Sequence, residues 1–571
     1  MTNINLFIPN INEINGFVGL ILFIFVSTII GQNISPNKKL LSLNFFLGYG
    51  IIYFFSVFLY VCFSIEVRIS YYIILFLALA NLILKFNFFK EMSKVIFKRF
   101  KNNIHIFFLV LPLFIIIFNS KALGWDTFSH WLPLANALDQ SSEFLLRGHA
   151  TNYPFASTLV LVFSSLLVDG ISENVSALFS FFQLILIFEL INYIIQKNNS
   201  STNNIFIKPL LVFFIFYNPI HLNKFVYSSY SDFDTSVAIL ISTYLLFQFY
   251  SNYENKKLWI SISVIGCLIV GLKNTGIVLV AFSMTIFFII SLYENFRNTF
   301  KTYLAPLILI NIPILLCWSL WQYLLYANNM SEVFFVYDFI RHDLIVSFFK
   351  NIIFQINERK IFYYFSFIII LLALFRPKIL KVDKELNYYV LFYAHLFIFW
   401  FIFLVITFIY HFNSGILNNA TSFWRYNSQI SVSLLFLFCL LLSNFLNHKN
   451  YLNSKKLVNI ISILILILPI IFLYKLRRDL EPRYLTILDF SKFQNKVNRA
   501  LVISSDSSYN AVRLNYYLNN DYRKSIVDYM DISKIKNFDA KSYSENNIYD
   551  LVILLDQSEI LNFKKDIYIK K

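Results

Sequence analysis

Residues 276–292 read GIVLVAFSMTIFFIISL and contain no charged side chain. An apolar run of about 17 residues is close to the length that an α-helix needs to cross the hydrocarbon core of a bilayer. Similar runs recur along most of the chain. They do not alternate between apolar and polar residues with period two, which argues against a transmembrane β-barrel. This pattern predicts a polytopic helical membrane protein.

The composition of the whole chain supports the same class. Hydrophobic residues make up 58% of its 571 residues and charged residues 14%, whereas a soluble domain averages about 25% charged residues. Such a chain has too few charges to cover a water-facing surface. We therefore expect an all-α polytopic membrane protein with about 13–15 transmembrane helices.

The formal net charge of +16 does not indicate a nucleic-acid partner, because the basic residues lie in short loops between apolar runs. The positive-inside bias assigns these loops to the cytoplasmic side. The basic clusters are Lys38–Lys39, Lys90 to Lys101, Lys256–Lys257, Arg297 with Lys301, Arg376 to Lys381, and Lys449 to Lys456. The four cysteines lie inside apolar runs without metal-type spacing, so neither a disulfide framework nor a zinc site is predicted.

The segments 125–154, 232–234, 327–344 and 411–429 then face outward, as does the region after Tyr474. Three apolar runs lie between the 125–154 loop and Asp232, yet two outward loops must be separated by an even number of crossings. The short run at 154–168 is our candidate for a re-entrant or interfacial element.

Three domains follow from this organisation. Residues 1–103 hold additional N-terminal transmembrane helices, and residues 104–475 form a transmembrane core with an outward loop at 120–154. Residues 476–571 are charged and Asn-rich, which predicts a small extracytoplasmic α/β domain. Its expected elements are a strand at 499–504, a helix at 509–518 and a strand at 550–556. A packing or acceptor-positioning role suits a unit of this size.

The first polar motif is GWDTFSHW at 124–131. Asp126 follows an apolar run directly and is expected at the outer membrane boundary. In a helix, Asp126 and His130 share a face. Trp125 and Trp131 are natural interface anchors. An ordinary aromatic belt with a helix-capping Asp is the alternative.

The second motif is SSYSDFD at 228–234, just before a long apolar run. Asp232 and Asp234 are suited to capping the helix N-terminus, where its dipole favours negative charge. The functional alternative is a second acid that faces Asp126 across an outward cavity.

The third motif is GLKNTG at 271–276, which lies between two apolar runs on the outer side. A lysine at the hydrocarbon edge is costly unless it snorkels to water or pairs with an anion. Lys273 is therefore either a snorkelling lysine or a ligand for a phosphate group.

The fourth motif is FWRY at 423–426. An outward Arg flanked by aromatic residues goes against the positive-inside bias, and a guanidinium binds phosphate through paired hydrogen bonds. Arg425 is thus expected to have an anionic partner, and Arg341 in another outward loop is a weaker candidate. A P-loop, a dinucleotide fingerprint, an HExxH motif and a nucleophile elbow do not occur in the sequence.

The order of these features resembles the GT-C superfamily of glycosyltransferases, in particular the branch with protein O-mannosyltransferases and the lipid A aminoarabinose transferase. The motifs that carry the resemblance are WDTFSHW, NYP at 152–154, SDFD and GLKNTG, within residues 104–290. The resemblance implies a GT-C-like fold and a catalytic acid at Asp126. It also implies a second acid at Asp232 or Asp234 and a lysine near the donor at Lys273.

A sugar on a polyprenyl phosphate already has a good leaving group. One carboxylate acting as general base on the acceptor hydroxyl therefore suffices, whereas glycosidases generally need a second carboxyl group. We expect Asp126 to be this base, inversion at the anomeric carbon, and assistance from His130 and from Asp232 or Asp234.

Cations stabilise the departing phosphate. Lys273 and Arg425 are the expected ligands, and a divalent metal such as Mg or Mn would act in the same way. The candidate metal ligands are Asp126, Asp232 and Asp234. The further substrate-binding candidates are Tyr153, Trp131 and Arg341.

These observations favour an outward-facing sugar transferase in a bacterial inner membrane. Its partners would be a polyprenyl-phosphate-linked sugar, a glycan, lipid or protein acceptor, and membrane lipids. A polysaccharide polymerase or ligase is an alternative, because such enzymes rely on outward arginines such as Arg341 and Arg425. A transporter or flippase of lipid-linked glycans is another, since such proteins place charges within their spans, as Glu189 is here.

Overall fold

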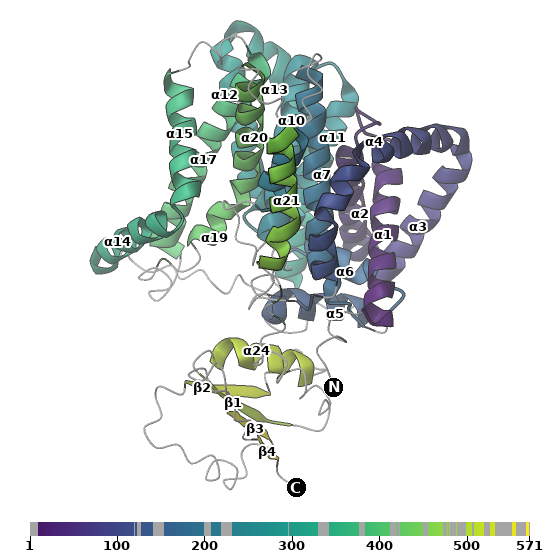
Figure 1. Ribbon diagram of the computed structural model, residues 1–571, viewed down its shortest axis with the longest axis vertical. Helices are drawn as coiled ribbons and strands as arrows, with labels where there is room; N and C mark the ends of the chain where they lie inside the picture. Colours follow the sequence, from purple (N-terminus) through teal and green to yellow (C-terminus); the bar gives the residue numbers. More distant parts are fainter. Residues whose placement is uncertain are drawn as a thin grey trace.

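The chain forms a helical bundle with a small sheet beyond one end of it, as the computed structural model shows (Figure 1). The structure describes residues 9–118, 120–122, 127–140, 153–168, 170–198, 207–217, 231–294, 296–328, 342–375, 383–411, 420, 423–448, 455–471, 477, 479, 487, 498–504, 507–518, 526–531, 551–554 and 567–569.

Nine helical stretches of the described residues are long and apolar enough to cross a membrane. They are α1 (Ile11–Gly31), α2 (Leu41–Phe63), α3 (Val67–Leu84), α7 (Asn174–Asn198), α10 (Ser231–Ser251), α12 (Gly276–Glu294), α13 (Phe296–Ala327), α17 (Lys384–His411), and α19 (Phe423–Asn427) continued by η5 (Ser428–Ile430) and α20 (Ser431–His448). The other helices of the bundle are α4 (Phe86–Phe118), α8 (Ile207–Phe216), α11 (Lys256–Leu272), α14 (His342–Glu358), α15 (Lys360–Phe375) and α21 (Lys455–Ile471).

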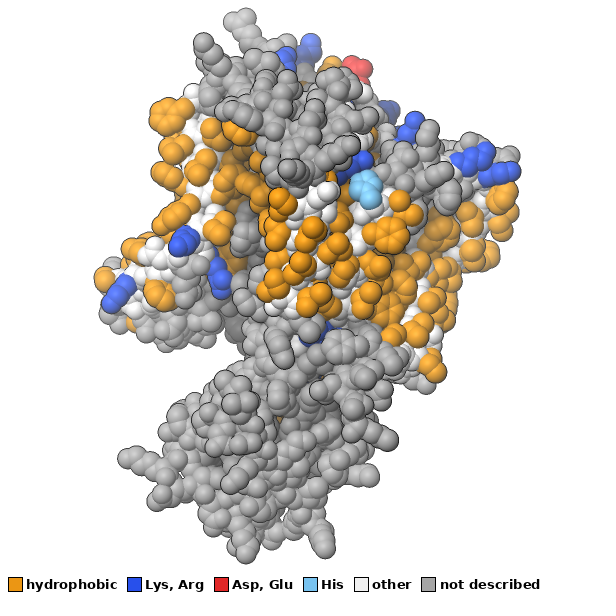
Figure 2. Space-filling model, in the orientation of Figure 1, with side chains coloured by type: hydrophobic (Ala, Val, Ile, Leu, Met, Phe, Trp, Pro, Cys, Tyr) orange, Lys and Arg blue, Asp and Glu red, His pale blue; other side chains and the backbone are white. Residues whose placement is uncertain are grey.

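The surface of the bundle is apolar. Large side chains such as Phe76, at 71% exposure, and Ile312, at 55%, point outward, and Figure 2 shows hydrophobic side chains along the visible helices. Aromatic side chains such as Trp321 and Trp400 fill the interior. An exposed apolar surface of this extent is typical of a lipid-facing protein. The predicted class, an all-α polytopic membrane protein, is confirmed, while the total of about 13–15 spans stays a prediction.

Two of the predicted basic loops lie at one end of the bundle, those of Lys38–Lys39 and Lys256–Lys257. Three contacts join the loops there, namely Lys85 with Asn33, Ser261 with the Ile34 carbonyl, and Lys197 with Glu385. Lys38–Lys39 and Lys256–Lys257 lie in the same loops. We call this the basic end. The opposite end faces the C-terminal sheet and is called the junction end (Figure 1).

The short helix α6 (Ala156–Ser164) lies inside the bundle. The Tyr49 hydroxyl of α2 donates to the Ala156 carbonyl at 2.6 Å. At the other end of α6, the Ser164 backbone lies directly against Gly19 of α1, where a side chain would not fit. All residues of α6 are buried.

Both ends of the segment around α6 return to the junction end. Before it, Tyr153 contacts the ring of His130 in the 127–140 segment. After it, the Leu167 carbonyl accepts from Asn15 Nδ2 at 3.2 Å, near the start of α1. The run at 154–168 therefore enters the bundle and leaves it on the same side. This path is consistent with the predicted re-entrant or interfacial element, which stays a prediction, as does the number of crossings between this run and Asp232.

The C-terminal sheet has the order β2-β1-β3-β4. Its strands are β1 (Ala500–Ser504), β2 (Val527–Asp531), β3 (Leu551–Leu554) and β4 (Ile567–Ile569), and α24 (Ser507–Leu518) packs against β1 and β2. β1 pairs in parallel with β2 and β3, and β4 is antiparallel to β3. The predicted strands at 499–504 and 550–556 and the predicted helix at 509–518 are all found, while β2 and β4 are additional.

Candidate functional site

Asp232 lies at the start of α10, and only 1% of its surface is exposed. Its Oδ1 accepts hydrogen bonds from the Lys273 ammonium and from Gln429 Nε2, the latter at 2.8 Å. Its Oδ2 faces the Arg425 guanidinium, with Nε at 3.5 Å. Three segments that are far apart in the sequence thus meet at one carboxylate. We call these four residues the Asp232 site.

The turn between α11 and α12 places Lys273 in this site. α11 ends at Leu272, and Lys273 has an extended backbone with φ −157° and ψ 149°. The Gly276 N–H then donates to the Lys273 carbonyl at 2.8 Å and closes the turn. Thr275 Oγ1 donates to Gln429 Oε1 at 3.1 Å. The Gln429 amide is therefore held at both ends, by Thr275 and by Asp232.

Both glycines of the GLKNTG motif have a steric role. Gly271 lies against the ring of Tyr53, and Gly276 lies against the carbonyl of Ile269. A Cβ atom at either position would collide with its neighbour. Gly271 thus lets α2 approach α11, and Gly276 lets the chain pack closely against α11 after the turn at Lys273.

An aromatic ring lies beside both cations. The centroid of Tyr426 is 5.3 Å from Lys273 Nζ and 5.4 Å from the Arg425 guanidinium carbon, distances at which cation–π attraction operates. Trp400 Nε1 donates to the Tyr426 carbonyl at 3.1 Å and fixes the backbone of α19. Two cations from separate segments thus converge on one buried carboxylate.

Asp234 is also buried, but it belongs to a different environment. It lines a small cavity of 20 Å³ together with three serines of α6 and α7, namely Ser157, Ser176 and Ser180. A polar cavity of this size holds about one water molecule. The two acids of the SDFD motif therefore have different surroundings, and Asp232 is the one that contacts Lys273.

Three other predicted residues form a second group at the junction end. His130 and Trp131 lie on η2 (Thr127–Trp131), a π-helical turn, and the ring of Tyr153 lies 5.2 Å from the His130 ring and 5.5 Å from the Trp131 ring. His130 and Trp131 are buried. π-helical turns occur frequently at functional sites. We call these residues the His130 group.

The segment around α6 lies between the two groups. Phe155, two residues after Tyr153, contacts the Tyr53 ring at 5.5 Å. Tyr53 in turn packs against Gly271, two residues before Lys273. Asp232 and His130 therefore belong to the same end of the bundle. The rings of Phe155 and Tyr53 lie between the two groups.

Asp126 and Arg341 lie outside the described residues. Their predicted roles as general base and substrate ligand therefore stay predictions, as does a metal held by Asp126, Asp232 and Asp234. Within the part of the chain that the structure describes, no group of three or more His, Cys, Asp or Glu side chains could hold a metal ion. The contacts of Asp232 with Lys273 and Gln429 suit a counter-ion that orients cations better than a proton acceptor.

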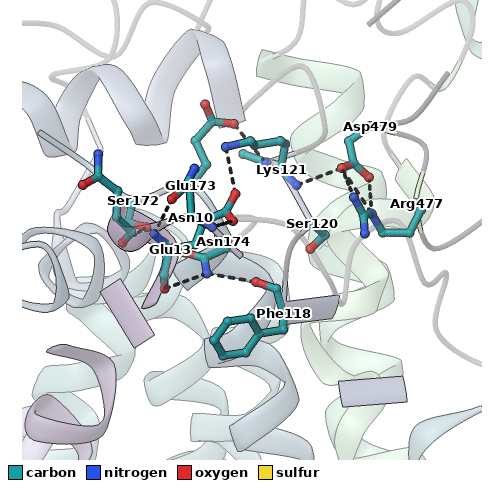
Figure 3. Close-up of polar contacts among 12 residues, drawn as sticks. Asn10, Glu13, Phe118, Ser120, Lys121, Ser172, Glu173, Asn174, Arg477 and Asp479 are labelled. Atoms are coloured by element: carbon teal, nitrogen blue, oxygen red, sulfur yellow. Dashed lines mark hydrogen bonds and ion pairs between the residues drawn. The ribbon is translucent and has the colours of Figure 1, made fainter. Parts of the chain in front are cut away.

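The sequence analysis missed a second polar cluster, at the junction end (Figure 3). Lys121 Nζ pairs with Glu13 Oε1 at 3.0 Å, and the Lys121 N–H donates to Asp479 Oδ2 at 3.2 Å. Asp479 also accepts from the Arg477 guanidinium, with Nε 3.0 Å from Oδ1 and Nη2 3.0 Å from Oδ2. Glu173 accepts from the Ala122 N–H at 3.1 Å. We call Glu13, Lys121, Glu173, Arg477 and Asp479 the junction network.

One signal for this network was present in the sequence. Lys121 follows an apolar run on the outward side, against the positive-inside bias that drew attention to Arg425. Burial alone would lower the pKa of Lys121, but Glu173, Glu13 and Asp479 outweigh it and raise this pKa. The ammonium is therefore charged at neutral pH and holds the acids together.

Comparisons with protein-family models and with curated protein sequences find no match to this chain.

Proposed function

We propose that the protein transfers a sugar from a polyprenyl-phosphate donor to an extracytoplasmic acceptor, which is a cell-surface glycan, a lipid or a protein. The observation that carries the proposal is the Asp232 site. There, Lys273 and Arg425 come from separate segments and point at one carboxylate near the junction end. A lipid-borne phosphate needs such a pair of cations at the membrane boundary, where its tail can remain in hydrocarbon.

The reaction needs a base and a place for the leaving group. The acceptor oxygen forms a bond to the anomeric carbon while the bond from that carbon to the phosphate oxygen breaks. The acceptor proton passes to the carboxylate of Asp126, and the electron pair leaves with polyprenyl phosphate. Lys273 and Arg425 stabilise the charge that develops on this phosphate. Attack opposite the leaving group inverts the anomeric carbon.

Asp232 acts as a counter-ion that fixes the positions of Lys273 and Arg425. Its Oδ1 accepts from the Lys273 ammonium and from the Gln429 amide, which holds the carboxylate in place, and its Oδ2 attracts the Arg425 guanidinium. A phosphate oxygen is able to share both cations without removing the carboxylate, because each cation has several N–H donors. This role replaces the metal-binding role within our proposal.

We further propose that the basic end is cytoplasmic and that the junction end faces outward, in a bacterial inner membrane. A cysteine at each end tests this orientation in a Cys62→Ala background, because the other three cysteines are buried. Glu66→Cys places an exposed thiol near the junction end, and Glu254→Cys places one at the basic end. A membrane-impermeant maleimide should label intact cells only through position 66. Labelling through position 254 alone would reverse the orientation.

The test of the activity is release of polyprenyl phosphate from a labelled lipid-linked sugar by the purified protein. Asp126→Asn should lower the rate by about 10²- to 10⁴-fold, the usual contribution of a general base. Glu66→Gln is the matched control, because Glu66 is an exposed acid near the same end of the bundle. Unchanged turnover in Asp126→Asn removes Asp126 from the role of base.

The same assay distinguishes the proposed transferase from the main alternative. A polysaccharide polymerase or ligase, which Arg425 also suits, releases polyprenyl diphosphate from a diphosphate-linked glycan. Release of the monophosphate identifies the transferase. Release of the diphosphate alone identifies the polymerase or ligase.

A further inference from the structure

The described residues 120–122, which precede Asp126, are held by Asp479 from the C-terminal part of the chain and by Glu173, just before α7. The Lys121 N–H donates to Asp479 at 3.2 Å, and the Ala122 N–H donates to Glu173 at 3.1 Å (Figure 3). Glu173 is itself fixed by Tyr517 of α24, whose hydroxyl donates to Oε1 at 2.8 Å. The Lys121 N–H is thus bound directly by the C-terminal part of the chain. The Ala122 N–H is bound through Glu173, which Tyr517 holds.

The same helix, α24, holds the other side of the segment. Asn136 Nδ2 donates to the Tyr516 hydroxyl at 3.2 Å. The rings of Tyr516 and Phe128 lie 5.5 Å apart, and the Arg513 guanidinium lies 5.0 Å from the Phe128 ring. Arg513 is fully buried. These contacts fix η2 (Thr127–Trp131) and α5 (Leu132–Gln140) against the C-terminal sheet unit.

Residues 123–126 connect these two anchored stretches. These four residues, Asp126 among them, lie outside the described part of the chain. Thr127, the residue after Asp126, is fully buried. The described stretches before and after Asp126 are therefore both held by residues far along the chain: the Lys121 N–H donates to Asp479, 358 residues later, and Asn136 donates to Tyr516, 380 residues later.

We propose that the C-terminal unit is a clamp that positions the loop of Asp126, with Tyr516 and Tyr517 as positioning residues. The effect of this clamp on catalysis rests on the proposed function. The unit needs no activity of its own for this role.

The chemistry of the contacts suits a permanent clamp. Burial and the neighbouring Glu173 raise the pKa of Tyr517 well above its usual value, so its phenol remains a donor at physiological pH. Both tyrosines can lose the hydroxyl without losing the ring, which separates their hydrogen bonds from their packing.

The experiment uses the full chain and two single variants, Tyr516→Phe and Tyr517→Phe, with the double variant. Hydrogen–deuterium exchange of the backbone in residues 120–136 is measured in each. We expect exchange about fivefold faster there for each hydrogen bond lost, with no change in α10. Tyr529→Phe is the control, because Tyr529 lies on β2 with 60% of its surface exposed. Wild-type exchange in the double variant overturns the clamp.

The release of polyprenyl phosphate supplies a second readout. A positioning role predicts that kcat falls about fivefold or more in the double variant, while the KM for the lipid donor stays within about twofold. Faster exchange with an unchanged kcat overturns the positioning role. If the wild-type protein releases no polyprenyl phosphate, the proposed function fails, and the exchange experiment still decides whether the clamp exists.

Discussion

The Asp232 site and the junction network are both buried and both contain paired charges, yet they are built differently. The described part of the Asp232 site holds one carboxylate and two cations, which come from different segments. The junction network holds three carboxylates and two cations, and its acids also accept from the backbone N–H groups of Lys121 and Ala122. The first arrangement suits an incoming anion, and the second suits the fixing of a loop.

This difference shows that burial of an ion pair does not by itself identify a functional site. Buried pairs gain little net stability from their Coulomb attraction, because desolvation costs a comparable amount. The two clusters differ in their hydrogen-bond donors. The acids of the junction network accept from backbone N–H groups, whereas Asp232 accepts from side chains. The following predictions test the comparison, beginning with the largest expected effect.

Asp479→Ala should destabilise the junction strongly. It removes the partner of the buried Arg477, and breaking such a pair costs about 3–5 kcal/mol. The measurement is the thermal unfolding of the purified protein followed by fluorescence. Asp528→Ala is the matched control, since its pair with Arg499 is about half-exposed and should contribute about 0–1 kcal/mol. Equal losses in the two variants would remove the structural role of the junction network.

Lys273→Met should lower polyprenyl phosphate release by about 10²- to 10³-fold, the usual cost of losing one donor to developing charge. Lys197→Met is the control at the basic end, where Lys197 pairs with Glu385 at 3.6 Å. A rate within about twofold of wild type in both variants would contradict the phosphate role of the Asp232 site.

Gly271→Ala should cost about 1–3 kcal/mol of stability, as overpacking does in a dense interior. Its Cβ would meet the ring of Tyr53, which has no flexible end to move aside. Gly266→Ala on the same helix meets the flexible end of Ile314, so a smaller loss is expected. Both losses are read from thermal unfolding. An unchanged melting temperature in Gly271→Ala would show that Tyr53 and α2 move aside at no cost in stability, and would contradict the prediction.

The smallest effect concerns alkaline pH. The pKa of Lys121 is raised above its usual 10.5 in the folded protein. Its contribution to stability is therefore complete below about pH 10.5 and is lost as the pH rises through the folded-state pKa. Lys121→Met should flatten the fall of the melting temperature between about pH 10 and 12. An identical pH profile in this variant and the wild type would contradict the pKa shift.

Much of the fold is readable from local sequence. Apolar runs such as 276–292 place helices because the hydrocarbon core demands their length and composition. Counting crossings also drew attention to the run at 154–168, which enters and leaves the bundle on the same side. The loops of Lys38–Lys39 and Lys256–Lys257 lie at one end of the bundle, and their cytoplasmic orientation stays a prediction. The short strand Val527–Asp531 was missed, since its polar residues gave no apolar run.

The candidate site was readable only in part. Asp232, Lys273 and Arg425 were each identified because a charged side chain at a membrane boundary is costly unless it has a partner or a function. Gln429 was not, because an amide at a helix start has no local signal of its partner. The junction network was missed because Glu13, Lys121 and Asp479 are brought together by packing across most of the chain.

The most direct test of the central claim is the binding of polyprenyl phosphate to the purified protein, compared with the binding of the uncharged polyprenol. We predict that the wild type prefers the phosphate and that Lys273→Met and Arg425→Gln each weaken its binding by about 10- to 100-fold, the value of one charge-assisted hydrogen bond. Binding of the polyprenol should not change. Equal binding of the two lipids by the wild type, or phosphate binding that survives both substitutions, would contradict the account.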